Sequence, residues 1–271
     1  MTDRQRPIGI FDSGIGGLTV LKEILDKLPS ENTIYLGDTA RVPYGSRSPE
    51  TVTRYSFENT RFLSSKNVKI LVIACNTASS VSLSAVRKSF PVPVVGVIEP
   101  GARAAAAATK KKRIGVIGTE ATVRSGSYTM AIQAIDPSID VFGIPCPLFV
   151  PLVEEGWTDG QITEMVADRY LADMRKKDID TLVLGCTHYP LLKHVFSKIM
   201  GNNVTLIDSA IETACEISRI LEVQGLMNIS GQLVRHEFYV TDSPQKFLSV
   251  GQRFLGRTIE SIEKIQLEME V

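Results

Sequence analysis

The feature that most restricts how this sequence can fold is an apolar run that stops at a cysteine and occurs twice. Leu71–Ser79 and Leu182–Pro190 each contain four apolar or small residues, then a cysteine, then small polar residues. Such a run is typical of a strand buried in a parallel sheet, and the polar residues are typical of a turn that opens a helix. We therefore expect Cys75 and Cys186 at the carboxyl ends of strands, where open α/β sheets bind ligands.

Strand and helix patterns alternate along the rest of the chain. The expected strands are 8–11, 32–37, 68–74, 92–98, 113–118, 140–144, 181–185, 203–207 and 236–240. The expected helices are 18–28, 49–65, 77–88, 102–108, 122–135, 158–176, 190–200, 209–223 and 244–255. The last dozen residues are expected to form a charged helix or a frayed end. This alternation predicts an α/β fold, a doubly wound parallel sheet with helices on both faces.

Two offsets indicate that the α/β unit is duplicated. The run at 114–117 repeats the run at 8–11 after 106 residues (114 − 8), and Cys186 repeats Cys75 after 111 residues (186 − 75). We predict two related doubly wound parallel-sheet domains with the active site in the cleft between them. Because the first unit has too few elements, the C-terminal part is expected to pack on it. The predicted domains are 1–98 plus 209–271, and 99–208.

Composition excludes several classes of function. The chain has 271 residues, and its 30 Lys and Arg balance its 30 Asp and Glu. A neutral chain has no electrostatic reason to bind nucleic acid or an anionic membrane. The basic run 110–113 is interpreted as a solvated helix end or loop. Without 18 consecutive apolar residues or a signal-peptide pattern, we predict a cytoplasmic protein with no membrane partner and with free thiols.

The two repeated cysteines are the first candidates for chemistry. A thiolate is a nucleophile and a base, and a helix N-terminus or a cation favours it. The alternative, a cysteine that serves as a small buried hydrophobe, is preferred for Cys146 and Cys215. Zinc on Cys186 and His188 is disfavoured because the chain has no C-x₂₋₄-C pair, and no metal site is predicted. A redox dithiol would require C-x-x-C, which is also absent.

Polar residues at other strand ends are the second group of candidates. Asp12 and Asp38 each end a strand, so each is either a helix N-cap or a functional carboxylate that orients an amine or a base. If both units point into one cleft, they converge there with the two cysteines. Glu154 follows an apolar run and, by pattern alone, is a helix end. The glycine-rich turn 13–17 matches neither G-x-G-x-x-G nor a P-loop, so nucleotide binding is only weakly supported.

Six motifs together resemble the bacterial glutamate racemases: 12–17, 37–45, 74–78, 96–101, 149–154 and 184–192. The resemblance covers about residues 8 to 215. It implies a cofactor-independent racemase that interconverts L- and D-glutamate and supplies D-glutamate for peptidoglycan. It also implies a two-domain α/β fold, with the second domain inserted in the first, and a homodimer.

The resemblance also implies roles for single residues. Cys75 and Cys186 would be the two acid/base residues, assisted by Asp12 and His188, with Glu154 and Asp38 near the site. The positions that match substrate-binding residues, besides Asp12 and His188, are Ser13, Pro43, Tyr44, Gly45, Asn76, Thr77 and Thr187. The chemistry suits these residues, because racemisation must remove a proton from one face of Cα and return one to the other.

Two other functions remain open from the sequence. One is a related two-cysteine enzyme that acts on aspartate, hydantoins or a malonate. The other is a non-enzymatic amino-acid binding protein, for which a two-lobed α/β cleft is equally suitable. A binding protein has no need of a pair of thiols, so turnover distinguishes the two classes.

Overall fold

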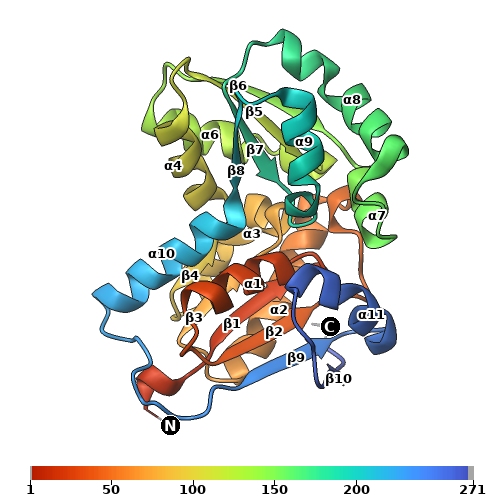
Figure 1. The fold of residues 1–271 in the computed structure, drawn as a ribbon. Helices are drawn as coiled ribbons and strands as arrows, with labels where there is room; N and C mark the ends of the chain where they lie inside the picture. Colours follow the sequence, from red (N-terminus) through yellow and green to blue (C-terminus); the bar gives the residue numbers. More distant parts are fainter. Residues whose placement is uncertain (1, 268–271) are drawn as a thin grey trace.

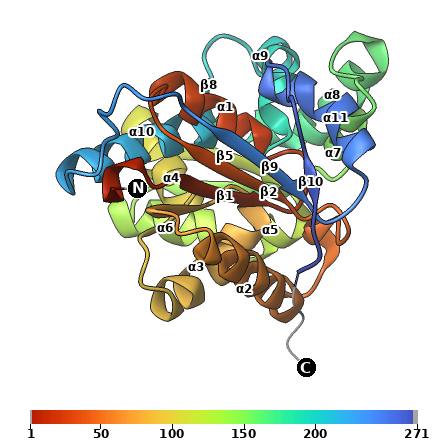
Figure 2. The same cartoon turned by 90° about the horizontal axis from the view of Figure 1, so that it is seen from below.

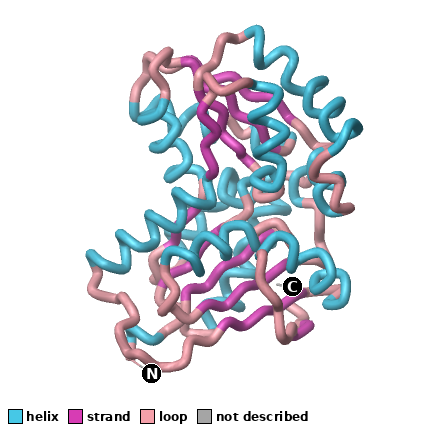
Figure 3. Tube along the Cα trace, viewed as in Figure 1, coloured by secondary structure: helices cyan, strands magenta, loops and turns pink. Residues whose placement is uncertain are grey.

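The computed structural model describes residues 2–267, which form two lobes, each built on a parallel sheet (Figure 1). The first lobe's sheet has the strand order β10 (Glu263–Lys264), β9 (His236–Val240), β2 (Thr33–Gly37), β1 (Ile8–Asp12), β3 (Ile70–Ile73), β4 (Val94–Gly96). The second lobe's sheet has the order β6 (Asp140–Pro145), β5 (Arg113–Gly118), β7 (Thr181–Gly185), β8 (Thr205–Asp208). Figure 3 separates the two groups of strands clearly. The α/β class and the pair of parallel sheets predicted from the sequence are confirmed.

The two sheets repeat one topology. The order β2-β1-β3-β4 of the first sheet recurs as β6-β5-β7-β8 in the second, four strands further along the chain. The register repeats too, since Ile8 pairs with Ile70 and Ile114 pairs with Thr181. These pairs are related by the same two offsets, 106 and 111 residues, that the sequence displays. The repeat in the sequence is therefore a repeat in the fold.

Helices cover both faces of each sheet. In Figure 2, α1 lies on one side of the first sheet and α2 and α3 lie on the other. The helices are α1 (Leu18–Lys27), α2 (Pro49–Ser65), α3 (Asn76–Ser89), α4 (Ile98–Ala108), α5 (Glu120–Arg124), α6 (Ser127–Ile135), α7 (Phe149–Glu154), α8 (Gly160–Lys176), α9 (Lys193–Met200), α10 (Ser209–Val223) and α11 (Pro244–Leu255). Short 3₁₀ helices lie at Asp3–Gln5, Tyr44–Ser46 and Tyr189–Leu192. Strands covered in this way are buried along their whole length, as β1, β2, β3 and β7 are.

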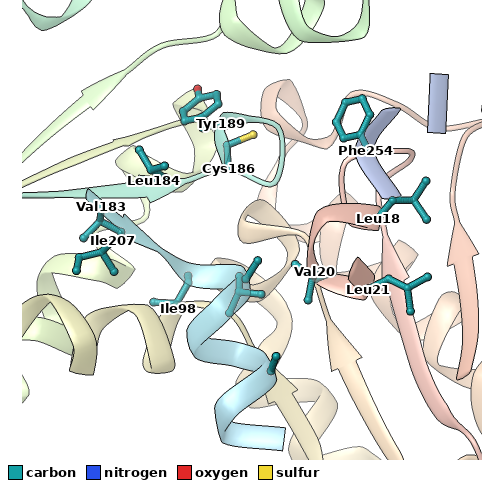
Figure 4. Close-up of a cluster of buried hydrophobic side chains, with 14 of the residues drawn as sticks. Leu18, Val20, Leu21, Ile98, Val183, Leu184, Cys186, Tyr189, Ile207 and Phe254 are labelled. Atoms are coloured by element: carbon teal, nitrogen blue, oxygen red, sulfur yellow. The ribbon is translucent and has the colours of Figure 1, made fainter. Parts of the chain in front are cut away.

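The hydrophobic core continues from one lobe into the other. One cluster contains Leu18 and Val20 of α1, Ile98 of α4 and Val183 of β7, and Figure 4 shows it crossing the boundary between the lobes. A second cluster fills the space between the first sheet and α2 and α3. Burial of apolar surface shared by both lobes stabilises their relative position.

Helices α4 and α10 follow the two points where the chain passes between the sheets. α10 packs against α1 of the first lobe and against α4. It begins where Asp208 accepts a hydrogen bond of 2.9 Å from the Ala210 amide, as a helix N-cap does. The C-terminal strand β9 then pairs with β2, so the prediction that the tail returns to the first unit is confirmed.

Several predicted boundaries are wrong. The strand expected over 92–98 ends at Gly96, and α4 begins at Ile98, because proline is accepted in the first turn of a helix and Pro100 lies there. The helix expected over 122–135 is broken at Gly126, which has a φ of 66°. The helix expected over 190–200 starts as a 3₁₀ turn.

The expectation for the end of the chain is also wrong where the structure describes it. Glu263–Lys264 forms β10, which pairs with the free edge of β9, and no charged helix forms up to residue 267. Residues 268–271 of that expected segment lie outside the described residues.

Two further expectations, for the basic run and for the cysteines, can be compared with the structure. Residues 110–112 of the basic run 110–113 are exposed and precede β5, which begins at Arg113, and Lys111 and Lys112 pair with Asp178 and Asp136. The cysteines at 75, 146, 186 and 215 are free, although Cys215 is exposed on α10 and is not a buried hydrophobe. Across residues 2–267, no helix has both the length and the apolar character needed to cross a bilayer.

Candidate active site

A cavity of about 410 Å³ lies between the lobes, at the carboxyl ends of the strands of both sheets. The first lobe lines it with the residues that follow β1, β2 and β3, and the second lobe with those that follow β5, β6 and β7. Of the residues singled out from the sequence, the cavity contains Ser13, Pro43, Tyr44, Gly45, Cys75, Asn76, Thr77, Glu154, Cys186, Thr187 and His188. Repetition of one topology thus brings equivalent strand ends to a common space.

Cys75 is the N-cap residue of α3, two residues after β3. Its Sγ accepts a hydrogen bond of 3.5 Å from the Ala78 amide and lies 3.6 Å from Ser13 Oγ. Burial, and next the negative charge of Asp12, raise the pKa of this thiol to about 12, against the effect of the Ala78 amide. With its pKa raised in this way, Cys75 is protonated at neutral pH and is therefore a potential proton donor.

Cys186 directly follows β7 and is part of a chain of three polar groups. Its Sγ lies 3.9 Å from Nδ1 of His188, whose Nε2 lies 3.2 Å from Oε1 of Glu154. Burial lowers the pKa of His188, but hydrogen bonds with Cys186 and Glu154 outweigh it and raise the pKa to about 10. The hydrogen bond from His188 in turn lowers the pKa of Glu154. This arrangement keeps the imidazole cationic beside the Cys186 thiol.

Asp12 differs from its expected position. Its side chain is fully buried and is not part of the cavity wall. Oδ2 accepts a hydrogen bond of 2.9 Å from the Gly14 amide, and α1 begins only at Leu18, so Asp12 is not a helix N-cap. Burial raises the pKa of Asp12, while backbone amides and the charge of His188 act against this. Asp12 therefore shapes the turn that carries Ser13 and places a carboxyl group near both Cys75 and His188.

Asp38 also lies behind the cavity and not in its wall. Its carboxylate accepts hydrogen bonds from the Tyr44 hydroxyl, from Nε of Arg41 at 2.7 Å and from Oγ1 of Thr241 at 3.0 Å. Tyr44 in turn accepts from Nδ2 of Asn59 at 3.1 Å. Asp38 thus anchors the loop whose residues 43–45 form part of the cavity wall.

Hydroxyl and amide groups join the two lobes at the cavity. Thr77 Oγ1 lies 2.8 Å from Thr119 Oγ1 and 3.2 Å from Thr122 Oγ1. The Tyr128 hydroxyl donates to Oδ1 of Asn76 at 2.7 Å. Because Oδ1 is used in this way, Nδ2 of Asn76 is oriented as a donor, and it has no protein partner among the described residues.

The backbone of the glycine-rich turn passes very close to the second lobe. A Cβ on Gly16 would lie 2.2 Å from Oγ1 of Thr187 and 2.5 Å from the His188 ring. On the next helix, Oγ1 of Thr19 donates to the Thr187 carbonyl at 2.9 Å. Glycine at position 16 therefore permits the approach that keeps the Cys186 loop against α1.

Thr119 is a cavity residue that the sequence reasoning missed. It follows β5 and caps α5 by accepting from the Thr122 amide at 3.2 Å. Its signal was present in the repeat, because Thr119 is 106 residues after Ser13, the offset that relates β1 to β5. Glu120, Pro147, Val150 and Pro151 also line the cavity, and no motif pointed to Glu120 or Pro147.

The assembled site can carry out acid–base chemistry at one carbon atom. Two thiols enter the cavity from different sheets, each with its own ionisable neighbour, and donors from both lobes surround them. Positioned groups of this kind transfer protons to and from a substrate. Donors that converge in a partly closed cavity stabilise developing negative charge.

The chain resembles known proteins over nearly its whole length. Residues 10–216 match the model of the Asp/Glu/Hydantoin racemase family. The chain is 54% identical over 265 residues to a glutamate racemase of Geobacter metallireducens, which covers 98% of both chains. It superposes on the glutamate racemase of Francisella tularensis, solved with D-glutamate, with a TM-score of 0.92, 40% identity and coverage of 98% and 99%. It also superposes on the glutamate racemase of Thermus thermophilus, solved with beta-chloro-D-alanine, with a TM-score of 0.90 and 44% identity. This match covers 99% of this chain and 100% of the other.

A more distant structure shares the fold alone. The aspartate racemase of Picrophilus torridus superposes with a TM-score of 0.56 at 19% identity, covering 83% of this chain. The three near full-length relatives described above are each named glutamate racemase, which agrees with the resemblance of the sequence motifs. The chain is therefore an amino-acid racemase that belongs to the Asp/Glu/Hydantoin racemase family, among its glutamate racemases.

Proposed function

We propose that this enzyme racemises glutamate by a two-base mechanism in which Cys75 and Cys186 act from opposite faces of the substrate's Cα. The observation that carries the proposal is that the two cysteines follow equivalent strands, β3 and β7, of the two repeated sheets and line one cavity. In each direction one sulfur removes the α-proton as a thiolate, and the other donates a proton as a thiol. After one turnover their protonation states are exchanged.

The surrounding groups have distinct parts in this mechanism. His188, held by Glu154, balances the charge of the Cys186 thiolate. Asp12 is the ionisable residue that assists Cys75. The α-proton of an amino acid is weakly acidic, so the carbanion-like transition state needs stabilisation. Donors at Asn76 and Thr187 would bind the α-carboxylate, and the partly closed cavity would exclude water. Two thiols are sufficient as bases, so the proposal requires no cofactor.

The remaining substrate contacts follow from the cavity wall. Ser13 and residues 43–45 come from the first lobe, opposite Thr119, and would hold the rest of the substrate together with Thr77. The complex of a related enzyme, that of Francisella tularensis, with D-glutamate supports glutamate as the substrate. On the basis of the family resemblance, we further propose that D-glutamate is made for peptidoglycan in the cytoplasm. We also propose that the enzyme is a homodimer, which sedimentation analysis tests.

The proposed domain boundaries follow the two chain crossings. We propose that residues 1–98 and 209–271 form one domain and 99–208 the other. The strands of the first sheet fall within 8–96 and 236–264, and those of the second within 113–208, which supports this division.

Replacement of either cysteine tests the mechanism. Cys75→Ser and Cys186→Ser should each lower kcat by at least about 10³-fold, because positioned acid–base groups contribute that much and serine is a far weaker acid. Circular dichroism of L- and D-glutamate measures the rate in both directions, and Cys215→Ser on exposed α10 is the control. Normal rates in either active-site variant would exclude the two-base assignment.

Turnover in deuterated water is the complementary test. Because the incoming proton comes from a thiol that exchanges with solvent, each product molecule should carry deuterium at Cα. Mass spectrometry reads the uptake, and product without deuterium contradicts the mechanism. The same assay with aspartate in place of glutamate tests whether the enzyme is specific for glutamate.

A further inference from the structure

We propose that Arg253 of α11, supported by Lys246, is a positioning residue that keeps Glu154 and His188 aligned with Cys186 from the opposite lobe. This inference rests on the two-base function proposed above and assigns a task to a helix outside the cavity wall. It is carried by one hydrogen bond, one glycine and one ion pair at the end of α7, and by one ring contact with His188.

Arg253 binds the C-terminal end of α7. Its Nη2 donates a hydrogen bond of 2.7 Å to the backbone carbonyl of Glu154, the last residue of that helix. The final carbonyls of a helix have no partner within it, and the helix dipole makes that end attractive to a cation. A helix of six residues has little stability by itself, so external contacts determine where it lies.

Gly156 leaves the space that the guanidinium occupies. It has a φ of 82°, and a Cβ at this position would lie 2.0 Å from Nη1 of Arg253. Glycine is thus required here both for the backbone conformation and for the approach of the arginine. The turn after α7 and the side chain on α11 fit each other across the boundary between the lobes.

Glu154 is held from both sides. Its Oε1 lies 3.2 Å from Nε2 of His188, and its Oε2 lies 3.6 Å from Nζ of Lys246. Beside them, the Phe254 ring packs edge-on against the His188 ring, with centroids 5.1 Å apart and an interplanar angle of 83°. Consecutive residues of α11 therefore contact the helix end and the imidazole.

α11 is anchored in the first lobe, so these contacts are made between lobes. Phe247 packs on Tyr35 of β2 with ring centroids 5.8 Å apart, and Gly251 lies against Leu18 of α1. Figures 1 and 2 both place α11 beside α7, and Figure 4 shows Phe254 facing the loop that carries Cys186. The position of the first lobe thereby sets the geometry of a base carried by the second.

The contacts of α11 reach the neighbours of Cys186 but not Cys75. Cys75 is positioned by Ser13 and Ala78, and no described contact joins it to α11. Loosening α11 from α7 should therefore slow the proton transfer at Cys186 and leave the one at Cys75 intact.

The test compares Arg253→Met with a matched control. Arg257→Met removes a cation just beyond α11 that pairs with Asp26 instead. A displacement of about 1 Å can cost about 100-fold, and we expect a smaller movement, with a loss of kcat/KM of about tenfold in Arg253→Met and none in the control. Arg253→Lys, which retains one donor to the carbonyl, should recover part of the loss.

Isotope effects locate the slowed step. The enantiomers have equal free energy, so kcat/KM must fall equally in both directions and cannot reveal which base is affected. With substrate deuterated at Cα, the isotope effect on kcat/KM should rise for the enantiomer that Cys186 deprotonates. It should fall for the other enantiomer, whose labelled proton is removed by Cys75 before the slowed step.

The results separate this inference from the function on which it rests. Wild-type kinetics in Arg253→Met, or isotope effects that change in the same direction for both enantiomers or not at all, overturn the positioning role alone. Failure of the wild-type enzyme to incorporate solvent deuterium, or full activity of Cys186→Ser, overturns the two-base function itself. Thermal unfolding of each variant confirms that folded enzymes are being compared.

Discussion

At the scale of single residues, the two cysteines are equivalent in topology but not in surroundings. Cys75 has a carboxyl group nearby, and burial together with Asp12 raises the pKa of its thiol. Cys186 has an imidazole nearby, which Glu154 orients. A symmetric reaction is thus proposed for two thiols in different electrostatic surroundings, one near a buried carboxyl group and one beside a cationic imidazole.

The protonation of His188 gives a prediction at this scale. Glu154→Gln removes a charge that raises the pKa of His188, so that pKa should fall from about 10. Titration of ¹⁵N-labelled protein by NMR measures it directly, since the chain has three histidines. His194, whose side chain lies outside the cavity, is the internal control. An unchanged His188 titration would show that the carboxylate does not raise this pKa.

The sign of the effect on stability follows from linkage. The pKa of His188 is raised above its ordinary value of 6.5 in the folded enzyme. The resulting stabilisation is complete below about pH 6.5 and is lost as the pH rises through about 10. Urea unfolding of the wild type should therefore show a free energy of unfolding that falls over this range, and falls less in Glu154→Gln.

At the scale of elements, a buried ion pair helps to hold four segments of the chain together at one end of the first sheet. Lys69, just before β3, donates to Oε2 of Glu31 at 2.5 Å and to the carbonyls of Arg4 and Leu226 at 2.7 and 2.8 Å. Oε1 of Glu31 accepts from the Asn228 amide at 2.8 Å. These bonds fix the N-terminus and the segment after α10 against the sheet, at the end opposite the cavity.

Removal of Lys69 should destabilise the fold and leave the chemistry intact. Lys69→Met leaves the buried Glu31 carboxylate unpaired, which costs about 3–5 kcal/mol of the free energy of unfolding. The double variant with Glu31→Gln should regain part of this, because a neutral amide still accepts from Asn228. Urea denaturation measures both, and Lys22→Met, in a partly exposed ion pair, should change little. A loss below about 1 kcal/mol contradicts this role.

At the scale of the whole molecule, the cavity depends on how the two lobes are placed. Its walls come from both sheets, and the lobes are held by a shared apolar cluster, by Tyr128 on Asn76 and by Thr19 on Thr187. A ligand that contacts both walls binds the folded, assembled protein and not the unfolded chain. Binding should therefore stabilise the fold even when catalysis is absent.

This coupling predicts a thermal shift without turnover. In the double variant Cys75→Ser and Cys186→Ser, glutamate at about 100 times its Kd should add about 2.7 kcal/mol to the free energy of unfolding. Differential scanning calorimetry measures the rise in Tm. Asn76→Ala, which removes an unpaired donor of the cavity, should give a smaller rise at the same concentration. If glutamate raised the Tm of the double cysteine variant and of Asn76→Ala by the same amount, the ligand would bind outside this cavity.

The predicted elements are wrong where one local sequence pattern is compatible with two kinds of secondary structure. The run 92–98 is apolar throughout, and such a run does not distinguish a strand from the first turn of a buried helix. The predicted helix begins only at residue 102, although proline at position 100 is accepted in a first helical turn. β10 could not be predicted, because Glu263 and Lys264 pair with β9 only where the assembled sheet leaves an edge free.

By itself, the sequence determined the alternation of strands and helices, the repeat of one unit and the presence of a cysteine after β3 and β7. These are consequences of local periodicity and strand burial, which neighbouring residues encode. Only the tertiary structure decided that Asp12 and Asp38 lie behind the cavity wall and that Thr119 meets Thr77. It also brought Arg253 to Glu154, 99 residues away. Such contacts depend on how two lobes pack, and packing between distant surfaces leaves no periodic signal in either segment.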